Sequence, residues 1–304
     1  MARNEQIKTY IQQSRDLYPL FLRAAKRFIA GETREEGVNK AKVLSKKGYR
    51  ISLEYIGENT QTVQGCKEAK QEFLALIKDL SEHQRDATIS LDLSHIGLSI
   101  DSDLALNHLH QIAGEAKKYG HTVIISMEES EKTDQILDMY KKTTMEYPNV
   151  GITIQAHLYR SQEDIQKLLN YPGKIRLVKG AYQEDPDIAM PRSKALTERY
   201  LHFINTIVDA RHSLSIASHD ETVLDNVVQK EFFNQANVEI EMLYGIRPDL
   251  LRSLKEKGAQ TKVYLTYGSE WYLYLCHRIA EYPPNVYTMI SDMVHPGEFE
   301  RNTY

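Results

Sequence analysis

The chain has 304 residues, a formal net charge of −4 and an isoelectric point near 6.3. It carries no stripe of lysines and arginines interleaved with aromatic residues, so its composition argues against nucleic acid as a partner. At this length it can form one large domain or two ordinary ones, each with a substantial core.

Residue usage also bears on the compartment and the cofactor class. Cys66 and Cys276 lie far apart without C-x-x-C spacing, as in proteins of a reducing compartment. The segment Met1–Lys8 has no apolar signal region, and no stretch approaches the roughly 18 apolar residues of a membrane span. The histidines show no metal-binding spacing, and no Walker loop or G-x-G-x-x-G motif is present. We expect a cytoplasmic protein without a metal site.

Residues 1–50 have a charged, helical pattern with an apolar patch at Tyr18–Leu22. We expect this segment to form extra helices that pack on the outside of the domain that follows. Residues 51–304 contain no interdomain linker, low-complexity tract or convincing repeat, so we predict that they form a single domain.

Within residues 51–304, eight short runs rich in β-branched residues are typical of buried strands. They are 51–56, 88–93, 122–127, 151–155, 174–179, 214–218, 238–242 and 262–266. Segments with helical periodicity follow them: 62–80, 102–119, 132–145, 162–170, 194–210, 221–233, 248–257 and 270–281. Asp101, Ser161 and Asp220 are cap-like residues at three helix starts. Eight alternations in about 250 residues predict an α/β fold, a closed (β/α)8 barrel of the TIM type.

Barrel enzymes place their chemistry at the C-terminal ends of the strands. In this chain nearly every predicted strand carries a polar residue there: Glu54, Asp92, Ser126 with Glu128, Gln155, Lys179, Ser218 with His219, Glu241 and Tyr264. Any one of them could be a satisfied core residue, but a full ring is what a ligand-filled barrel mouth would present.

Arg176 is the clearest single indication of a binding site. It lies in the apolar run Lys174–Tyr182, and buried strands exclude cations unless a partner is present. That partner can be a core carboxylate, or it can be an anionic or electron-rich ligand. Gly180 and Ala181 favour a ligand, because two small residues at a strand end let the backbone approach it closely.

Five segments, taken together, match one known family in order and spacing. They are Gln155–Arg160, Arg176–Tyr182, Ala217–Asp220, Leu243–Arg247 and Trp271–Asn285. These segments resemble bacterial monofunctional proline dehydrogenases, FAD-dependent barrels that oxidise proline to pyrroline-5-carboxylate. The resemblance extends from about the first strand to the end of the last predicted helix.

The resemblance implies FAD as the cofactor. The residues implied to contact it are Gln155, Arg176, Lys179, Gly180, Ala181, Ser218 and His219. Arg176 would lie beside the N5 region of the isoalloxazine ring, Gln155 would contact the ring, and Lys179–Ala181 would line the ribityl and phosphate path. A cation near the ring stabilises the anionic reduced flavin and so favours hydride acceptance.

The substrate side departs from the family pattern at three positions. The family has a lysine where this chain has Asp92, an aspartate where it has Ser126, and two consecutive arginines where it has His277 and Arg278. In the family, the lysine and both arginines hold the proline carboxylate, so Arg278 is the group retained. Unit charges about 4 Å apart interact by roughly 4 kcal/mol at an effective dielectric of about 20, as much as millimolar binding provides. Proline in the family pose is therefore predicted to be a poor substrate.

Two interpretations of Asp92 are open. In one, Asp92 pairs with Arg278, and the pocket keeps its shape without its function. In the other, Asp92 holds a cationic amine or acts as a base, on a substrate that lacks the usual carboxylate or binds in reverse. The retained residues Tyr264, Tyr274 and Glu281 favour the second, a changed specificity.

We therefore predict an FAD-dependent dehydrogenase that removes a hydride from a carbon next to nitrogen and releases an imine. Its substrate is proline or, in preference, a related amine or imino compound. The predicted catalytic residues are Asp92, Tyr264 and Arg278, and the predicted substrate-binding residues are Ser126, Tyr274, His277 and Glu281. The electron acceptor is not identified, and a peripheral membrane contact for electron transfer stays open.

In two alternative hypotheses the chain forms the barrel but does not catalyse the reaction. In the first, the chain is a catalytically idle barrel that binds flavin or a partner. In the second, the flavin is lost as well and the barrel serves in regulation. Glu241 in place of an expected glutamine and Ser218 in place of threonine keep that second alternative open.

Overall fold

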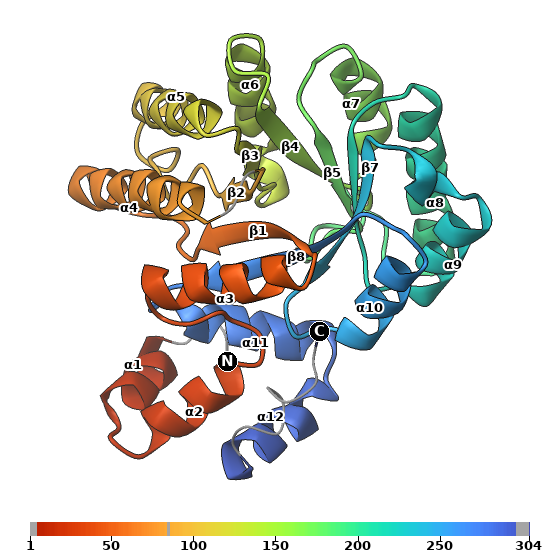
Figure 1. Ribbon diagram of the computed structural model, residues 1–304. Helices are drawn as coiled ribbons and strands as arrows, with labels where there is room; N and C mark the ends of the chain where they lie inside the picture. The colour runs from red at the N-terminus through yellow and green to blue at the C-terminus, as the bar shows by residue number, and fades with distance from the viewer. Residues whose placement is uncertain (1–4, 84–85, 296–303) are drawn as a thin grey trace.

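The computed structural model describes residues 5–83, 86–295 and 304. Within them, eight parallel strands close into a barrel in chain order, with the last strand paired to the first (Figure 1). The strands are β1 (Arg50–Tyr55), β2 (Thr88–Leu91), β3 (Thr122–Ile125), β4 (Val150–Gln155), β5 (Ile175–Val178), β6 (Leu214–Ala217), β7 (Val238–Leu243) and β8 (Thr261–Tyr267). The predicted (β/α)8 barrel is confirmed.

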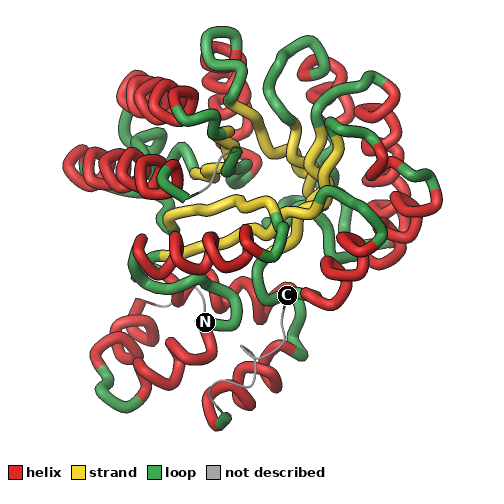
Figure 2. Tube along the Cα trace, in the orientation of Figure 1, coloured by secondary structure: helices red, strands yellow, loops and turns green. Residues whose placement is uncertain are grey.

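Seven helices connect successive strands and surround the barrel (Figure 2). They are α4 (Val63–Ser81), α5 (Ser102–Lys118), α6 (Thr133–Thr144), α7 (Ser161–Leu168), α8 (Lys194–Asp209), α9 (Glu221–Gln229) and α10 (Pro248–Glu256). Two short 3-10 helices, η1 (Ser130–Lys132) and η2 (Phe232–Asn234), lie before α6 and after α9. The predicted helix at 221–233 is thus divided into α9 and η2.

Capping residues set where several helices begin. Asp101 and Asp220 accept hydrogen bonds from backbone N–H groups in the first turns of α5 and α9, as predicted. The prediction was wrong for Ser161, because its hydroxyl donates to the carbonyl of Gln155 at 2.6 Å and the N-cap position belongs to Arg160. Ser161 therefore fixes the turn between β4 and α7.

The ring of helices departs from a regular barrel where β8 meets β1. The helix after β8, α11 (Trp271–Glu281), contacts α2 (Leu17–Ala25) and α12 (Asn285–Val294), whereas α3 (Arg34–Lys46) packs against β1 and β8 (Figure 1). Helix α1 (Glu5–Gln13) packs on α2. The (β/α)8 pattern would place residues 270–281 against β1 and β8, where α3 lies instead. Helix α12 was not predicted.

Two apolar clusters explain this arrangement. The main cluster lies between the barrel and its helices and includes residues of α3 such as Val38 and Leu44. A separate cluster, with Phe28, Ile29 and Trp271 nearly inaccessible to solvent, holds α11 against the N-terminal helices. Burial of apolar surface therefore favours α3 on the wall and moves α11 away from it.

The barrel interior is polar, in contrast to the branched apolar residues that usually fill a TIM barrel. Near the strand starts, Glu239 is 2% exposed and accepts hydrogen bonds from Lys174 at 2.7 Å, Lys262 at 2.6 Å and Arg50 at 3.2 Å. Because β5 and β7 are not neighbours, the contact between Glu239 and Lys174 crosses the interior. Each of these buried charges has a partner, as a low-dielectric interior requires.

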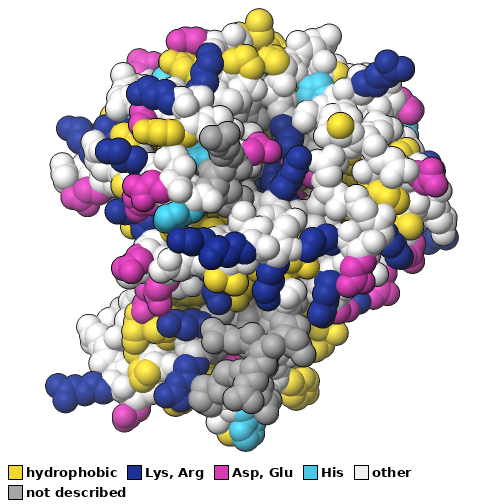
Figure 3. Space-filling view, in the orientation of Figure 1, with side chains coloured by type: hydrophobic (Ala, Val, Ile, Leu, Met, Phe, Trp, Pro, Cys, Tyr) yellow, Lys and Arg dark blue, Asp and Glu magenta, His cyan; other side chains and the backbone are white. Residues whose placement is uncertain are grey.

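The surface mixes both signs of charge. The face drawn in Figure 3 carries lysine and arginine side chains interspersed with acidic ones, in line with the small net charge. Among the helices of the described residues, none is both long and apolar enough to cross a bilayer.

Candidate active site

Arg176 lies in the middle of the barrel interior, where a carboxylate holds it. Its Nε and Nη2 donate to Glu241 at 3.1 and 2.9 Å, and Nη2 also donates to the hydroxyls of Ser52 at 3.0 Å and Ser90 at 2.7 Å. The ring of Tyr264 lies 4.9 Å from the guanidinium carbon. The core carboxylate that the sequence allowed as a partner is therefore Glu241. Nη1 makes no hydrogen bond within the described residues and can still donate to a ligand.

Above Arg176, acidic side chains gather at the mouth, the barrel end formed by the C-terminal ends of the strands. Asp92 directly follows β2, Ser126 directly follows β3, and both are partly exposed. The hydroxyl of Tyr264 donates to Glu54 on β1. Burial, reinforced by the carboxylates of Glu54 and Glu128, raises the pKa of Asp92 well above its usual range. Asp92 therefore binds a proton more readily than an ordinary aspartate.

Helix α11 brings the predicted substrate residues of the last helix to this region. Arg278 is 8% exposed, its Nη2 donates to Glu281 at 3.1 Å, and its guanidinium carbon lies 4.7 Å from the centre of the Tyr274 ring. Its Nε is buried and has no hydrogen-bond partner in the described part of the chain. His277 is half-buried. No ion pair between Arg278 and Asp92 occurs among the described residues, which argues against their mutual neutralisation.

Glu128 connects several loops at the mouth. Its buried carboxylate accepts from the backbone N–H of Ser94 at 2.9 Å and from Lys132 at 2.7 Å. Lys132 also donates to Asn59, after β1, at 2.7 Å. The side-chain amide of Gln155 donates to the backbone carbonyl of Glu128 at 2.9 Å, which fixes its orientation. Lys132 was not predicted, although its spacing of four residues from Glu128 is a recognisable ion-pair signal.

Lys179 is held between two elements beside the end of β5. Its ammonium group donates to Asp220 at 2.5 Å and to Thr197 at 2.7 Å. The hydroxyl of Ser218 accepts from the backbone N–H of Asp220 at 3.1 Å. Lys179 and Ser218 are therefore positioned by the same loop after β6.

His219 presents an unpaired donor. Its Nε2 accepts from the backbone N–H of Leu243 at 3.4 Å, so the ring proton belongs on Nδ1. Nδ1 is buried and has no partner within the described residues. Burial lowers the pKa of His219 to about 3, so the ring is neutral at physiological pH.

The backbone after β5 is packed tightly at Gly180. Gly180 has a φ of +115°, and an added Cβ would approach Nδ1 of His157 to 1.5 Å, so a larger residue is excluded. Nδ1 of His157 lies 3.0 Å from the carbonyl oxygen of Lys179, whereas its Nε2 is buried and lacks a partner in the described chain. Ala181, the next residue, is exposed. His157 was not predicted as a site residue, because nothing in its local pattern indicates this contact.

Tyr182 lies at the acidic side of the mouth. Burial and the nearby carboxylates of Asp92 and Glu58 raise its pKa above the ordinary value. The predicted strand-end residues and the run after β5 therefore meet at one end of the barrel.

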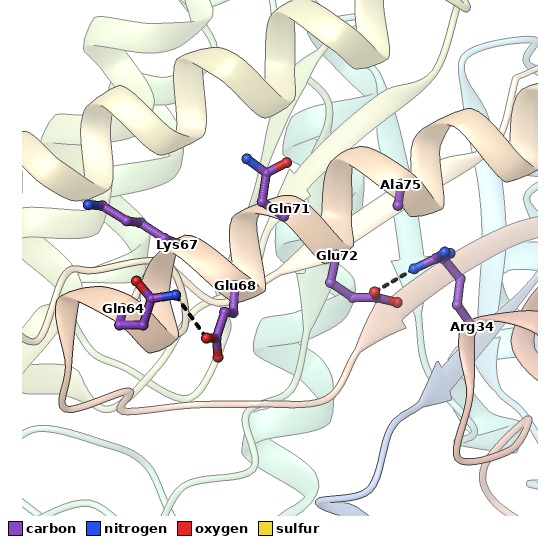
Figure 4. Close-up of a pocket in the computed structure, with 7 residues that line it drawn as sticks. All are labelled: Arg34, Gln64, Lys67, Glu68, Gln71, Glu72 and Ala75. Carbon is purple, nitrogen blue, oxygen red and sulfur yellow. Dashed lines mark hydrogen bonds and ion pairs between the residues drawn. The ribbon is translucent and has the colours of Figure 1, made fainter.

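A surface groove lies apart from this mouth, along the outer side of α4 (Figure 4). Arg34 pairs there with Glu72 at 2.5 Å, and Gln64 donates to Glu68 at 2.9 Å. These polar groups satisfy one another, whereas Arg176 below the mouth and Arg278 and His219 at the mouth each keep a donor without a partner among the described residues. The mouth is therefore the candidate active site.

Comparison with known sequences shows which family the chain resembles over most of its length. Residues 38–285 match the family model described as proline dehydrogenase. Proline dehydrogenase 1 of Bacillus subtilis (strain 168) is 34% identical over 264 residues, which cover 86% of this chain and 87% of that protein. Proline dehydrogenase of Deinococcus radiodurans is 32% identical over 278 residues, covering 89% of this chain and 90% of that protein.

Solved structures show the same fold within longer chains. Proline utilization A from Bdellovibrio bacteriovorus, inactivated by N-propargylglycine, superposes with a TM-score of 0.78 at 19% identity. The match covers 90% of this chain and 35% of that one. Proline utilization A from Bradyrhizobium japonicum gives a TM-score of 0.74 at 17% identity, covering 88% and 32%. The chain thus spans about a third of each of these proteins, and at these identities the likeness concerns the fold alone.

Proposed function

Because this chain belongs to the proline dehydrogenase family of FAD-dependent dehydrogenases, we propose that it oxidises a C–N bond of an amine recognised differently from proline. The observation that carries this proposal is the contrast between Arg176, held in an intact polar setting, and Asp92, an acidic residue in a crowded acidic mouth. An ionised Asp92 repels a carboxylate substrate and attracts an ammonium group, and an ammonium group beside it also favours its ionised form. We propose that the preferred substrate is a related amine or imino compound.

The residues around β4, β5 and β6 fit FAD. Arg176 Nη1 and His219 Nδ1 are donors without a partner in the described chain, and Gly180 lets the backbone approach a ligand closely. We propose that these groups, with Gln155 and Lys179, hold the cofactor. Bound FAD would supply the hydride acceptor. Arg176 would place positive charge where negative charge develops during the reaction, in a setting from which water is largely excluded.

On the substrate side, Asp92 would handle the amine proton. An amine must be unprotonated before the adjacent carbon can give up a hydride and form a C=N bond. The raised pKa of Asp92 makes its carboxylate a stronger base than that of an ordinary aspartate, which suits it to accept that proton. Tyr264 and Tyr274 would enclose the apolar part of the substrate. Arg278, with Nε unused and Nη2 oriented by Glu281, would hold a polar or anionic group.

A titration under anaerobic conditions tests this function. The purified protein, with its flavin content measured and reconstituted with FAD if needed, is offered proline, prolinamide and pyrrolidine while the flavin absorbance is followed. The proposal expects bleaching by an amine, with pyrrolidine or prolinamide acting at lower concentration than proline. A yellow protein that no amine reduces would favour the idle flavin-binding barrel. A colourless protein that FAD does not reconstitute would favour the barrel that has lost its flavin.

A further inference from the structure

A slot on the outer wall of the barrel is filled by the side chain of Tyr304. The slot is formed by Tyr49, just before β1, and by Tyr244 and Gly245, just after β7. We call these three residues, together with Lys47 and Lys255, the Tyr304 slot. Tyr304 packs against the main apolar cluster, to which Tyr49 and Tyr244 also belong.

The aromatic contacts of Tyr304 are specific in geometry. Its ring stacks on Tyr244 with the centroids 5.6 Å apart and the planes at 10°. It meets Tyr49 edge-on, at 5.5 Å and 81°. Offset-stacked and edge-to-face pairs are the favoured arrangements of aromatic rings. The slot therefore contacts the ring through one stacked and one edge-to-face arrangement.

Hydrogen bonds hold the hydroxyl and the backbone oxygen of Tyr304. The hydroxyl of Tyr304 accepts a hydrogen bond from the backbone N–H of Gly245 at 2.9 Å, and its backbone oxygen accepts from Lys47 at 2.9 Å. The ammonium group of Lys255 lies 4.6 Å from the centre of the Tyr49 ring, a cation–π contact that supports the wall of the slot. A phenylalanine in place of Tyr304 would leave the N–H of Gly245 without its acceptor.

The slot is also connected to α12 through described residues. Gly245 has a φ of +76°, and an added Cβ would lie 1.9 Å from the carbonyl oxygen of Arg27, so this position requires glycine. Arg27 in turn makes two hydrogen bonds to Asp292 on α12, at 2.5 and 2.6 Å. Tyr304, Gly245, Arg27 and Asp292 thus form one continuous series of contacts.

The position of the slot follows from the irregular ring of helices. Because α11 leaves the wall after β8, α3 and α10 both pack on β8, and Tyr304 packs against the main apolar cluster. We propose that the Tyr304 slot is a binding site for a phenol side chain, which this chain occupies with its own Tyr304 and which holds Tyr304 on the barrel wall. This inference does not depend on the proposed catalytic function.

Chemical rescue of a truncated side chain tests the inference. Thermal unfolding is measured for the whole chain as wild type, Tyr304→Phe and Tyr304→Ala, each with and without 4-methylphenol, and with toluene as the ring that lacks the hydroxyl. We expect Tyr304→Ala to lower the melting temperature by about 5 °C or more, and Tyr304→Phe by about 2–4 °C. Added 4-methylphenol should raise the melting temperature of Tyr304→Ala by about 2 °C, because a ligand that binds the folded state stabilises it.

The controls distinguish specific binding in the Tyr304 slot from general stabilisation of the protein by an added aromatic compound. Toluene should rescue Tyr304→Ala less than 4-methylphenol does, and 4-methylphenol should leave wild type unchanged because Tyr304 fills the slot. The inference is overturned if Tyr304→Ala unfolds at the wild-type temperature, or if 4-methylphenol shifts wild type as much as the variant. Since melting is measured without substrate, this result is independent of whether any amine reduces the flavin.

Discussion

The lower and upper halves of the barrel interior hold their charged side chains in different ways. Near the strand starts, Glu239 is surrounded by Lys174, Lys262 and Arg50, and all of its interactions are internal. At the mouth, Asp92 shares its surroundings with other carboxylates, and Nε of Arg278 has no hydrogen-bond partner among the described residues. The lower charges are explained by folding alone, whereas the upper ones have too few partners in the part of the chain that the structure describes. Unsatisfied charge in one end of an otherwise paired interior points to a ligand.

Arg176 stands at the boundary between these halves. Its pair with Glu241 belongs to the structural half, and its unused Nη1 belongs to the ligand-binding half. A buried arginine in a strand is therefore consistent with both roles that the sequence allowed, the core partner and the ligand contact.

The largest expected effect on stability comes from removing the carboxylate of Glu239 in the lower half of the barrel interior. Glu239→Leu would leave Lys262 and Lys174 buried without their carboxylate, which should cost about 3–5 kcal/mol in the free energy of unfolding. Urea denaturation measures this loss. Glu198→Gln is the matched control, because its pair with Lys194 is exposed and long, at 3.8 Å, and should contribute less than about 1 kcal/mol.

The stability difference between wild type and Glu239→Leu should also depend on pH. Burial alone would raise the pKa of Glu239, but Lys262 and Lys174 outweigh it and hold the pKa well below the ordinary value of 4.5. A carboxylate with a lowered pKa stabilises the fold above its unfolded pKa, and that contribution is lost as the pH falls towards the folded pKa. The stability gap between wild type and Glu239→Leu should therefore narrow below pH 4.5. A gap that widened in acid would contradict this account.

The next largest effect should come from the mouth. Arg278→Lys keeps the charge but loses the planar fork and the Nε donor, so kcat/KM for the amine that reduces the flavin should fall about 10- to 100-fold. Stability should change little in comparison, because the partner Glu281 is partly exposed. Steady-state kinetics with Arg247→Lys as a surface control measures the difference. Unchanged kinetics would remove Arg278 from the substrate site.

Restoring the family pattern should improve proline turnover. Asp92→Lys combined with His277→Arg replaces a repelling charge with two attracting ones, and we expect kcat/KM for proline to rise about tenfold or more. Each single variant serves as a control for the other. If the double variant does not raise proline turnover at all, the explanation of the altered pocket is wrong.

A smaller effect concerns the charge state of Asp92. Its pKa is raised by burial and by Glu54 and Glu128, so ionising it costs stability as the pH rises from the unfolded value near 3.8 through the folded pKa. Asp92→Asn should therefore melt at a higher temperature than wild type at pH 8. The two proteins should converge towards pH 3.8. Melting curves across this range would contradict the assignment if the difference stayed constant.

The smallest effect is expected at Glu281. Its pair with Arg278 spans one helical turn at 3.1 Å and is partly exposed, so Glu281→Gln should change the free energy of unfolding by about 0.5 kcal/mol or less. Substrate KM should rise modestly if Glu281 orients Arg278. A change as large as that of Arg278→Lys would mean that Glu281 itself contacts the substrate.

Much of the fold could be predicted because its signals are local. Alternating runs of β-branched and amphipathic residues indicate eight strand and helix units, and Asp101 and Asp220 mark helix starts by their own hydrogen bonds. The place of α11 could not be predicted in this way, because its packing against Trp271 and the N-terminal helices depends on contacts between distant segments. Ser161 was misassigned because its hydroxyl finds a nearer acceptor in the carbonyl of Gln155.

The candidate site was predictable at the strand ends and much less so inside the barrel. Strand periodicity brings Glu54, Asp92 and Ser126 to one mouth, as the structure has them. The partners of Glu239 come from three other strands or their edges, and no local pattern connects them. Pairing across a barrel is set by closure and register, which a single sequence does not specify.

The most direct test of the central claim is the rate of flavin reduction in the wild-type protein by pyrrolidine and by proline. Stopped-flow mixing under anaerobic conditions gives both rates on one preparation. We expect faster reduction by pyrrolidine, which presents an amine to Asp92 without a carboxylate. Faster reduction by proline at equal concentration would contradict the claim that the substrate half of this site has changed its specificity.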